Sequence, residues 1–481
     1  MPENCEISAA RHAARNAREQ HYRLQTEPCA RFALWGEKSY SESTYITLLL
    51  FRTAIPQASS GVQGCFKEYF IHKFRAMLGK NRIIFPGEKV LLAVSGGPSS
   101  CSMLSQVQEG LSQSAHKKLR FLPGIVYIDE GGALGQSLEE RQRTVAELQA
   151  VFKATGFPFH IVPLEQVLDL PSSVVVTAPS ASERPASAYK EAVDHFIQSN
   201  SRSGLTPQGQ EDTALPDVEE SHTQSLQQLI GCAKTLTARE DLLNTIRFAH
   251  TLIPLCPPQR QHLLVHTART EGYSKLMLGD NCTRLAVKLL TSISLGRGAQ
   301  LAQDTGFSDC RYGDIISVRP MRDYSAKEIA YYNRMFSVPS VFIPSLDTKT
   351  TDKASIQRLT ESFVTKLQAD FPSTVSTIYR TSEKLQTACK SSSTADQCDR
   401  CLLCMSTIDT AVENASAFKA TLISEKLSQT KSPGATGTEF PGQNPEPTDL
   451  KSLMCYSCQL TVKDLIREKI GEFLLVDDDE G

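Results

Sequence analysis

The sequence predicts an α/β fold built on a parallel β-sheet with helices on both faces. Short, continuous apolar runs are typical of strands that are buried on both sides of a sheet. Helical patterns stand between these runs, and this alternation favours parallel strands joined by crossover helices. Each run stops at polar or glycine residues, which mark a turn. The runs are residues 89–94, 124–128, 159–162, 275–278 and 315–318.

The helices are expected from capping and periodicity. Aromatic and aliphatic residues recur at helical spacing in Phe66–Leu78, before the first strand. A helix is expected after the glycine turn that follows the first strand. Ser137 and Glu140 have the spacing of a capping box, which predicts a helix start between the second and third strands. Further helices are expected at residues 285–290, 325–336, 353–371 and 374–385.

Length and composition set the limits of the interpretation. The chain has 481 residues, of which 40% are hydrophobic and 22% charged, enough for two or three domains with packed cores. Lys and Arg total 51 against 53 Asp and Glu, so a nucleic-acid partner would have to meet a local basic patch. No run reaches the ~18 apolar residues of a membrane span.

The cysteines and the first residues predict a cytosolic compartment. Fourteen cysteines without a secretory signal indicate reduced thiols. Arg11, Arg15 and Arg18 weakly resemble a mitochondrial presequence, but Glu6 and Glu19 interrupt the pattern, and such presequences avoid acidic residues.

Changes in pattern divide the chain into four expected parts. The first has no core face and is expected to be irregular. The second contains the strands, interrupted by a polar insertion at residues 179–223 that is expected to be disordered. The third is a helical extension, and the fourth is a cysteine-rich module with a low-complexity linker at residues 426–450. The parts are residues 1–64, 65–335, 336–390 and 391–481.

The turn after the first strand, residues 95–100, is a candidate phosphate loop. It reads Ser-Gly-Gly-Pro-Ser-Ser and leads directly into a helix. Glycines permit a positive φ and a close approach of the backbone, and the first N–H groups of a helix attract anions. An ordinary tight turn between a strand and a helix has the same composition, so this pattern alone leaves both interpretations open.

The surrounding residues carry a resemblance to a known family. The turn resembles the Ser-Gly-Gly-x-Asp-Ser loop of the N-type ATP pyrophosphatases, or PP-loop proteins, with an adenine nucleotide alpha hydrolase-like fold. Gly279-Asp280-Asn281 is similar to their second motif, usually Gly-His-Asn followed by two acids. Together with residues 70–82 and 319–323, these motifs resemble the cytoplasmic tRNA 2-thiolation protein 2 family, also called cytosolic thiouridylase subunit 2. The likeness runs from about Cys65 to Cys458.

The resemblance implies a subunit required for 2-thiolation of the wobble uridine (5-methoxycarbonylmethyl-2-thiouridine) in the tRNAs for Lys, Glu and Gln. It implies three partners: a catalytic thiouridylase subunit forming a heterodimer with this chain, a ubiquitin-related carrier that brings sulfur as a thiocarboxylate, and the tRNA. ATP would turn the C2 oxygen of the uridine into an AMP leaving group, which sulfur displaces. The implied setting is cytoplasmic, with no membrane.

Departures from the family motifs make independent catalysis doubtful. Ser99 stands where the active enzymes have an Asp that helps to hold Mg²⁺, and a hydroxyl is a poorer ligand for this hard cation. Cys282, Thr283 and Arg284 stand where acids are expected. ATP with Mg²⁺ is thus expected in the complex, without a firm assignment to this chain. The candidate nucleotide residues are Ser95, Gly96, Gly97, Ser99, Ser100 and Asp280.

Two cysteine pairs predict a metal site. Cys401-x-x-Cys404 and Cys455-x-x-Cys458 together supply the four thiolates of a tetrahedral structural zinc site. Cys398 extends the first pair to the spacing found in some iron–sulfur proteins, which is the alternative metal. The third interpretation is a set of unliganded thiols.

Cys282 has its own two interpretations. It lies on the nucleotide side, where Arg284 would lower the pKa of its thiol and favour a reactive, sulfur-carrying role. A lone cysteine at a helix start is more often a small packed residue.

A basic segment, Lys67–Arg82, is a candidate tRNA contact. Its positive residues would follow tRNA phosphates by charge and shape. The alternative is a solvated amphipathic helix whose aromatic side packs on the core. The candidates, including a second group near the loop, are Lys73, Arg75, Lys80, Arg82, Arg284 and Lys288.

Two other functions remain open from the sequence. The chain would be a self-sufficient ATP-dependent tRNA sulfurtransferase if its loop were active. It would be a zinc-stabilised interaction protein without RNA chemistry if the basic segment bound no RNA.

Overall fold

The computed structural model describes residues 60–112, 115, 118–168, 220–231, 233, 235–240, 243, 263–296, 301–312, 314–344, 354–382, 384, 401, 454–456 and 458–459. The expected insertion lies outside these residues up to 219, and α8 begins at Glu220. The linker 426–450 and Cys398 also lie outside them. The division into four domains stays a prediction.

Within the described residues, one six-stranded sheet forms the centre of the fold, with strand order β3-β2-β1-β4-β6-β5. The neighbouring strands pair in parallel, apart from β5, which pairs antiparallel with β6 at the edge. The strands are β1 Lys89–Ala93, β2 Leu122–Asp129, β3 Phe159–Pro163, β4 Lys275–Leu278, β5 Ser308–Tyr312 and β6 Ile315–Val318.

Five of these strands confirm the apolar runs of the sequence, and β5 was missed. The predicted α/β fold on a parallel sheet is confirmed, with one antiparallel strand added at its edge. The segment Ser308–Tyr312 has no apolar run, because Asp309 and Arg311 occupy its middle. An edge strand with one neighbour needs less apolar surface than a central strand, so periodicity gives no signal for it.

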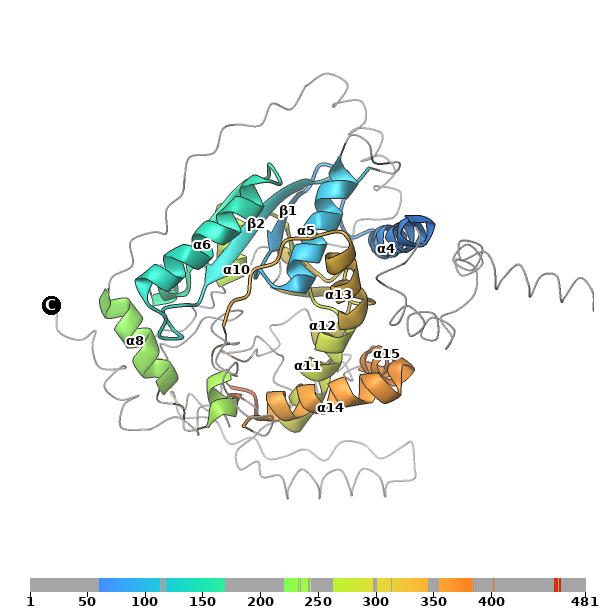
Figure 1. Ribbon diagram of the computed structural model, residues 1–481. Coiled ribbons are helices and arrows are strands. Elements are labelled where there is room, and N and C mark those ends of the chain that lie inside the picture. The colour runs from blue at the N-terminus through green and yellow to red at the C-terminus, as the bar shows by residue number, and fades with distance from the viewer. Residues whose placement is uncertain are drawn as a thin grey trace, which may run out of the picture.

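Helices cover both faces of the sheet, as the sequence predicts (Figure 1). Alternate residues of β1 separate the two cores: Val90 and Leu92 face one layer and Leu91 faces the other. The first layer contains α4 Ser60–Asn81, α5 Pro98–Leu111, α6 Leu138–Lys153 and α13 Ala326–Met335. The second contains α8 Glu220–Gly231, α10 Leu263–Thr270 and the 3₁₀ helix η3 Leu164–Leu168.

Another group of helices lies beyond the sheet rather than on it. Helix α11 begins just past the carboxyl end of β4 and packs against α14 and α15, with its own small apolar cluster around Leu285, Val364 and Tyr379. Figure 1 shows this group below the sheet, together with α12. The carboxyl end of β4 therefore meets a separate group of helices. These are α11 Cys282–Ser294, α12 Leu301–Thr305, α14 Ile356–Asp370 and α15 Pro372–Ser382.

None of the described helices combines the length and apolar character needed to cross a membrane.

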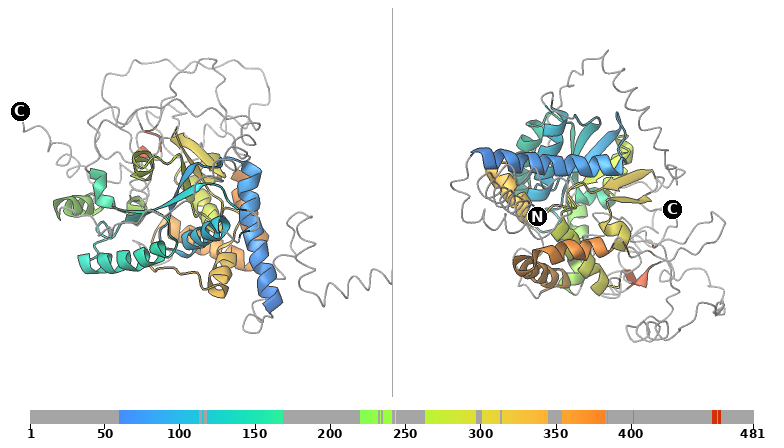
Figure 2. Two further views of the ribbon diagram at one scale, coloured as in Figure 1. Left: turned by 90° about the horizontal axis from the view of Figure 1, so that it is seen from above. Right: turned by 90° about the vertical axis from the view of Figure 1, so that its right-hand side faces the viewer.

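Helix α4 is held to α13 by a buried ion pair. Lys73 Nζ lies 3.0 Å and 3.2 Å from the two carboxylate oxygens of Glu328, and both side chains are buried. The ring of Tyr324 lies 4.6 Å from the same ammonium, and Phe70 stacks on Tyr332 at 4.0 Å. Figure 2 shows α4 as the long blue helix beside α13. Lys73 is therefore part of the core rather than of an open surface.

Replacing Lys73 with Met is expected to lower the free energy of unfolding by about 3 kcal/mol, because it leaves the Glu328 carboxylate buried without its counter-charge. Urea unfolding of the full chain measures this. Lys80, which is exposed on the same helix, provides the control: Lys80→Met should change stability by less than ~0.5 kcal/mol. Equal effects of the two substitutions would contradict a structural role for Lys73.

Candidate functional site

The turn between β1 and α5 has the geometry of an anion-binding loop. Gly96 has φ +77°, and a Cβ there would lie 2.9 Å from Leu148 Cδ2 and 3.0 Å from Ile343 Cδ1. Gly97 is the N-cap of α5, and Pro98 occupies the first helical position. Because proline has no N–H, the N-terminal donors of this helix begin at Ser99.

The structure brings this loop together with the second predicted motif. Asn281 Nδ2 donates a hydrogen bond of 2.7 Å to Ser99 Oγ. A Cβ on Gly279 would lie 2.9 Å from Ser100 Cα, so the end of β4 packs directly on the start of α5. Ser100 Oγ donates to the Gly97 carbonyl at 3.1 Å and lies 3.3 Å from Ser95 Oγ. The candidate nucleotide residues therefore form one cluster at the carboxyl edge of the sheet.

A segment that the sequence analysis did not single out, residues 338–344, crosses this loop. Val341 N–H donates to the Gly96 carbonyl at 2.9 Å, and Asn333 Nδ2, just before the segment, donates to the Pro98 carbonyl at 2.8 Å. The loop backbone is thus held on both sides of Gly97.

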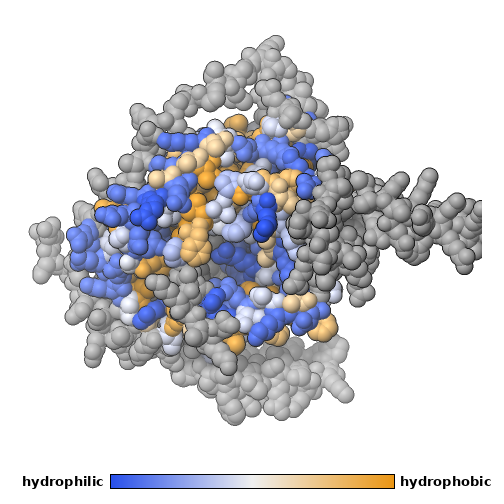
Figure 3. All heavy atoms as spheres, viewed as in Figure 1, coloured by the Kyte–Doolittle hydropathy of each residue, from blue (hydrophilic) through white to orange (hydrophobic). Residues whose placement is uncertain are grey.

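In the view of Figure 3, hydrophilic residues predominate and a band of apolar residues crosses the middle of the described surface.

Asp280, the acidic residue of the second motif, lies between two guanidinium groups. Its Oδ2 is 3.5 Å from Arg319 Nε, and its Oδ1 is 3.7 Å from Arg284 Nε. Burial alone would raise the pKa of this carboxyl, but Arg284, Lys288 and Arg319 hold the pKa below its ordinary value. Asp280 is therefore ionised and already has cationic partners.

Magnesium does not fit this arrangement. Mg²⁺ requires oxygen ligands at ~2.0–2.1 Å in a near-octahedral shell. The Asp280 carboxylate is paired with arginines, and Asn281 Oδ1 accepts the Arg284 backbone N–H at 2.8 Å as the cap of α11. Ser99 supplies a neutral hydroxyl that already accepts from Asn281. No catalytic step through magnesium is derived from these residues.

Cys282 is a packed residue and not an activated thiol. It is 5% exposed, and its backbone N–H donates to the Tyr324 carbonyl at 2.8 Å. Burial, followed by the nearby Glu328 carboxylate, raises the pKa of its thiol to about 12. The expectation that Arg284 would lower this pKa was wrong, because burial and the Glu328 carboxylate outweigh the nearby positive charge.

The basic candidates range from exposed through half-buried, such as Lys288, to buried. Lys80 and Arg82 are exposed at the end of α4, and Arg75 is partly exposed. Arg284 is 64% exposed beside the loop.

Two members of the basic set are unsuited to an open tRNA surface. Lys73 is buried against Glu328, and burial lowers the pKa of Lys288, which lies close to Asp304 and Asp280. The burial of Lys73 could have been predicted from its position in the sequence. It stands three residues after Phe70 and next to Phe74, on the apolar side of the helix.

Three of the four predicted metal ligands come together. The sulfur atoms of Cys401, Cys455 and Cys458 all lie within 4.8 Å of one another, and Cys401 and Cys458 are buried. Cys404 lies outside the described residues. Sulfur atoms at this separation are close enough to share one metal ion or one cluster. The donor set therefore fits a thiolate-bound metal, and it is compatible with zinc and with iron–sulfur.

The cysteine cluster is attached to the far end of α11. A Cβ on Gly296, just after this helix, would lie 2.9 Å from Tyr456 Cδ1, and Tyr456 stands between the second pair of cysteines. Helix α11 has 13 residues, a length of about 20 Å. It starts at the Asp280–Asn281 motif and ends at the cysteine site, so one element spans the two predicted sites.

A glycine loop that meets a Gly-Asp-Asn motif at the carboxyl edge of a mostly parallel sheet defines an α/β protein with a candidate anion-binding loop. A family model described as cytoplasmic tRNA 2-thiolation protein 2 matches residues 355–460. The chain belongs to the cytoplasmic tRNA 2-thiolation protein 2 family, because it shares 54% identity with the member from Danio rerio over 84% of this chain and 83% of that one.

A second relative supports the same family membership. The Homo sapiens protein of the same name is 49% identical, over 83% of this chain and 82% of that one. Among solved structures, the U34-tRNA thiolase NcsA from Methanococcus maripaludis, with its [4Fe-4S] cluster, is similar at 14% identity and a TM-score of 0.42, over 75% of this chain and 89% of that one.

In the native chain, iodoacetamide at pH 8 is expected to modify Cys310, which is exposed, and to leave Cys282 unmodified. With a pKa of about 12, the Cys282 thiol is protonated at this pH. Its thiolate fraction there is roughly one part in ten thousand. Peptide mass spectrometry measures both sites in one sample. Alkylation of the two cysteines at similar rates would contradict the buried thiol.

The chain purified without oxygen is expected to contain bound zinc or iron, and Cys401→Ala, Cys455→Ala and Cys458→Ala should each lose most of it. Elemental analysis by mass spectrometry measures the metal, and visible absorption separates a coloured iron–sulfur cluster from colourless zinc. Cys310→Ala is the matched control, because this cysteine lies outside the cluster. Metal content equal in all four variants would exclude a site at these cysteines.

Proposed function

We propose that this chain is a required, non-catalytic subunit of the machinery that 2-thiolates the wobble uridine of the tRNAs for Lys, Glu and Gln. Family membership carries the proposal, since the relatives that match over four-fifths of the chain are named cytoplasmic tRNA 2-thiolation proteins. The same names support a cytoplasmic location.

The non-catalytic role follows from the charges at the loop. Adenylation of the uridine C2 oxygen forms an O–P bond to AMP and releases pyrophosphate, so negative charge must be neutralised as the bond to pyrophosphate breaks. Magnesium usually does this, and here Asp280 is held by Arg319 and Arg284 while Ser99 accepts from Asn281. We assign adenylation to a partner ATP pyrophosphatase of the same class.

The proposed partners are that catalytic subunit, a ubiquitin-related carrier and tRNA. The sulfur of the carrier thiocarboxylate attacks C2 of the activated uridine, so the C2–S bond forms as the C2–O bond breaks and AMP leaves. Water then cleaves the acyl C–S bond, which leaves 2-thiouridine and the carrier as a carboxylate. Cys282 takes no part in this transfer, because its thiol is buried and protonated.

The exposed basic residues are proposed to contact tRNA phosphates. Lys80 and Arg82 at the end of α4, with Arg75 and Arg284, present positive charge without a rigid pattern for reading bases. Such contacts fix the position of an RNA and make its binding depend on salt. Lys73 and Lys288 are left out of this surface.

The metal is proposed to be structural zinc held by Cys401, Cys404, Cys455 and Cys458. Two C-x-x-C pairs supply a closed tetrahedral shell, which leaves no open position for a substrate. The contact of Tyr456 with Gly296 supports a role in attaching the C-terminal module to α11.

Cells that lack this chain are expected to lose 2-thiolated wobble uridine, and wild-type chain should restore it. Gly97→Asp tests the loop, because Gly97 has φ −72° and a Cβ there would be no nearer than 3.7 Å to Ser95 Oγ. It places a carboxylate at the anion site, and Gly97→Asn is the matched neutral control. Both variants should restore thiolation, since this loop is not the catalytic one. Mass spectrometry of digested tRNA measures the product.

Undiminished thiolation in cells without the chain would overturn the proposed function. Failure of Gly97→Asp alone, at equal protein levels, would show that the loop receives an anion. Release of pyrophosphate from ATP and tRNA by the purified chain alone would favour the self-sufficient sulfurtransferase.

A further inference from the structure

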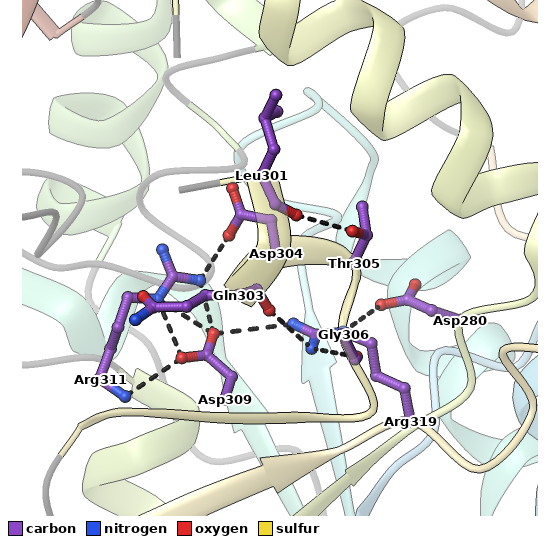
Figure 4. Close-up of polar contacts among 9 residues, drawn as sticks. All are labelled: Asp280, Leu301, Gln303, Asp304, Thr305, Gly306, Asp309, Arg311 and Arg319. Atoms are coloured by element: carbon purple, nitrogen blue, oxygen red, sulfur yellow. Dashed lines mark hydrogen bonds and ion pairs between the residues drawn. The ribbon is translucent and has the colours of Figure 1, made fainter. Parts of the chain in front are cut away.

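The residues around Asp280 form a largely buried network of opposite charges (Figure 4). Arg319 is 2% exposed and reaches Asp280 and Asp309, at 3.5 Å and 3.7 Å. Arg311 binds Asp309 and Asp304, each at 2.5 Å. Three carboxylates are thereby matched within the described residues by cations of the chain itself, since Lys288 also lies near Asp280 and Asp304.

The position of Arg319 is fixed from several sides. Its Nη1 donates to the carbonyls of Gln303 and Gly306 at 3.2 Å and 3.1 Å, and its backbone N–H donates to the Phe307 carbonyl at 2.8 Å. A guanidinium with this many partners cannot move away from Asp280 without leaving carbonyl groups unpaired in the interior.

A divalent ion at Asp280 would meet these cations. An ion ~2.1 Å from either carboxylate oxygen lies within about 6 Å of the nearest guanidinium nitrogen, whatever its direction. The repulsion is strong because Arg319 is buried, where charges are poorly screened. The neighbouring oxygens of Asn281 and Ser99 are already acceptors within the chain.

We infer that Arg319 is the permanent counter-ion of Asp280, taking the charge role that a divalent cation has in a metal-dependent phosphate site, and that this side of the loop binds no Mg²⁺. The inference depends on the contacts of Asp280 and Arg319 and not on a role in tRNA modification. It makes Asp280 a structural residue of this chain. The junction of β4, α12, β5 and β6 is then complete without a metal.

The first test compares metal responses in the purified full chain. The melting temperature of wild type should be the same without added divalent metal and with millimolar MgCl₂ or MnCl₂, because no carboxylate at the loop is available. Asp280→Asn should lower the melting temperature equally in both conditions, since it removes a partner of Arg319. Mn²⁺ binding followed by electron paramagnetic resonance should be the same in wild type and Asp280→Asn.

The second test removes the internal cation. Arg319→Met leaves Asp280 and Asp309 without this guanidinium, so the variant should be destabilised without added metal and recover several degrees in melting temperature with Mn²⁺ or Mg²⁺. Arg269→Met is the matched control, because Arg269 forms an ion pair of 2.6 Å with Asp314, and this pair lies away from the loop. It should show no gain of metal response.

Two results would overturn the inference. One is Mn²⁺ binding by wild type that is lost in Asp280→Asn. The other is a folded Arg319→Met chain that responds to metals no more than wild type does. If Arg319→Met does not fold, the comparison of wild type with Asp280→Asn still decides the question, and neither test depends on thiolation in cells.

Discussion

The burial of the Arg319 guanidinium is the constraint on which the loop side of this fold depends. A buried guanidinium is tolerated only when its charge is matched by nearby carboxylates. Arg319 itself lies just after β6, and its partners lie on three other segments: Asp280 after β4, the carbonyls around α12 and Asp309 on β5. The need to neutralise the charge of Arg319 therefore fixes the relative positions of the strand ends around the second motif.

Local signals in the sequence predicted most elements of the fold. Five strands were readable because each is a continuous apolar run, and the helix starts at Ser137 and Ser325 carry reciprocal capping contacts between residues three apart. Strand β5 was not readable, since its polar residues are stabilised by Arg319 and Asp304, partners that lie outside the strand. The partner of Lys73 is much more distant in sequence, because Glu328 lies 255 residues away.

The candidate sites differ in the same way, since some features follow from residues close in sequence and others depend on distant contacts. The glycine loop and the cysteine pairs were predicted because their residues are close in sequence and their chemistry follows from spacing. The role of Asp280 was not predictable, because it depends on Arg319, which lies after another strand. Cys282 is buried, as is usual for a lone cysteine at a helix start, and its packing partners come from α14 and α15. Motifs thus located the sites, while long-range contacts determined what those sites are suited to do.

The docking of Tyr456 beside Gly296 has a consequence for how the chain can vary in length. A metal held by Cys401, Cys455 and Cys458 would close a loop between the two cysteine pairs at a fixed place on the end of α11. The entropy of closing a flexible loop grows only with the logarithm of its length, by about 0.6 kcal/mol for each doubling. Insertions and deletions between the pairs would then leave the site nearly as stable, so this stretch is free to differ among relatives that keep the same four thiols.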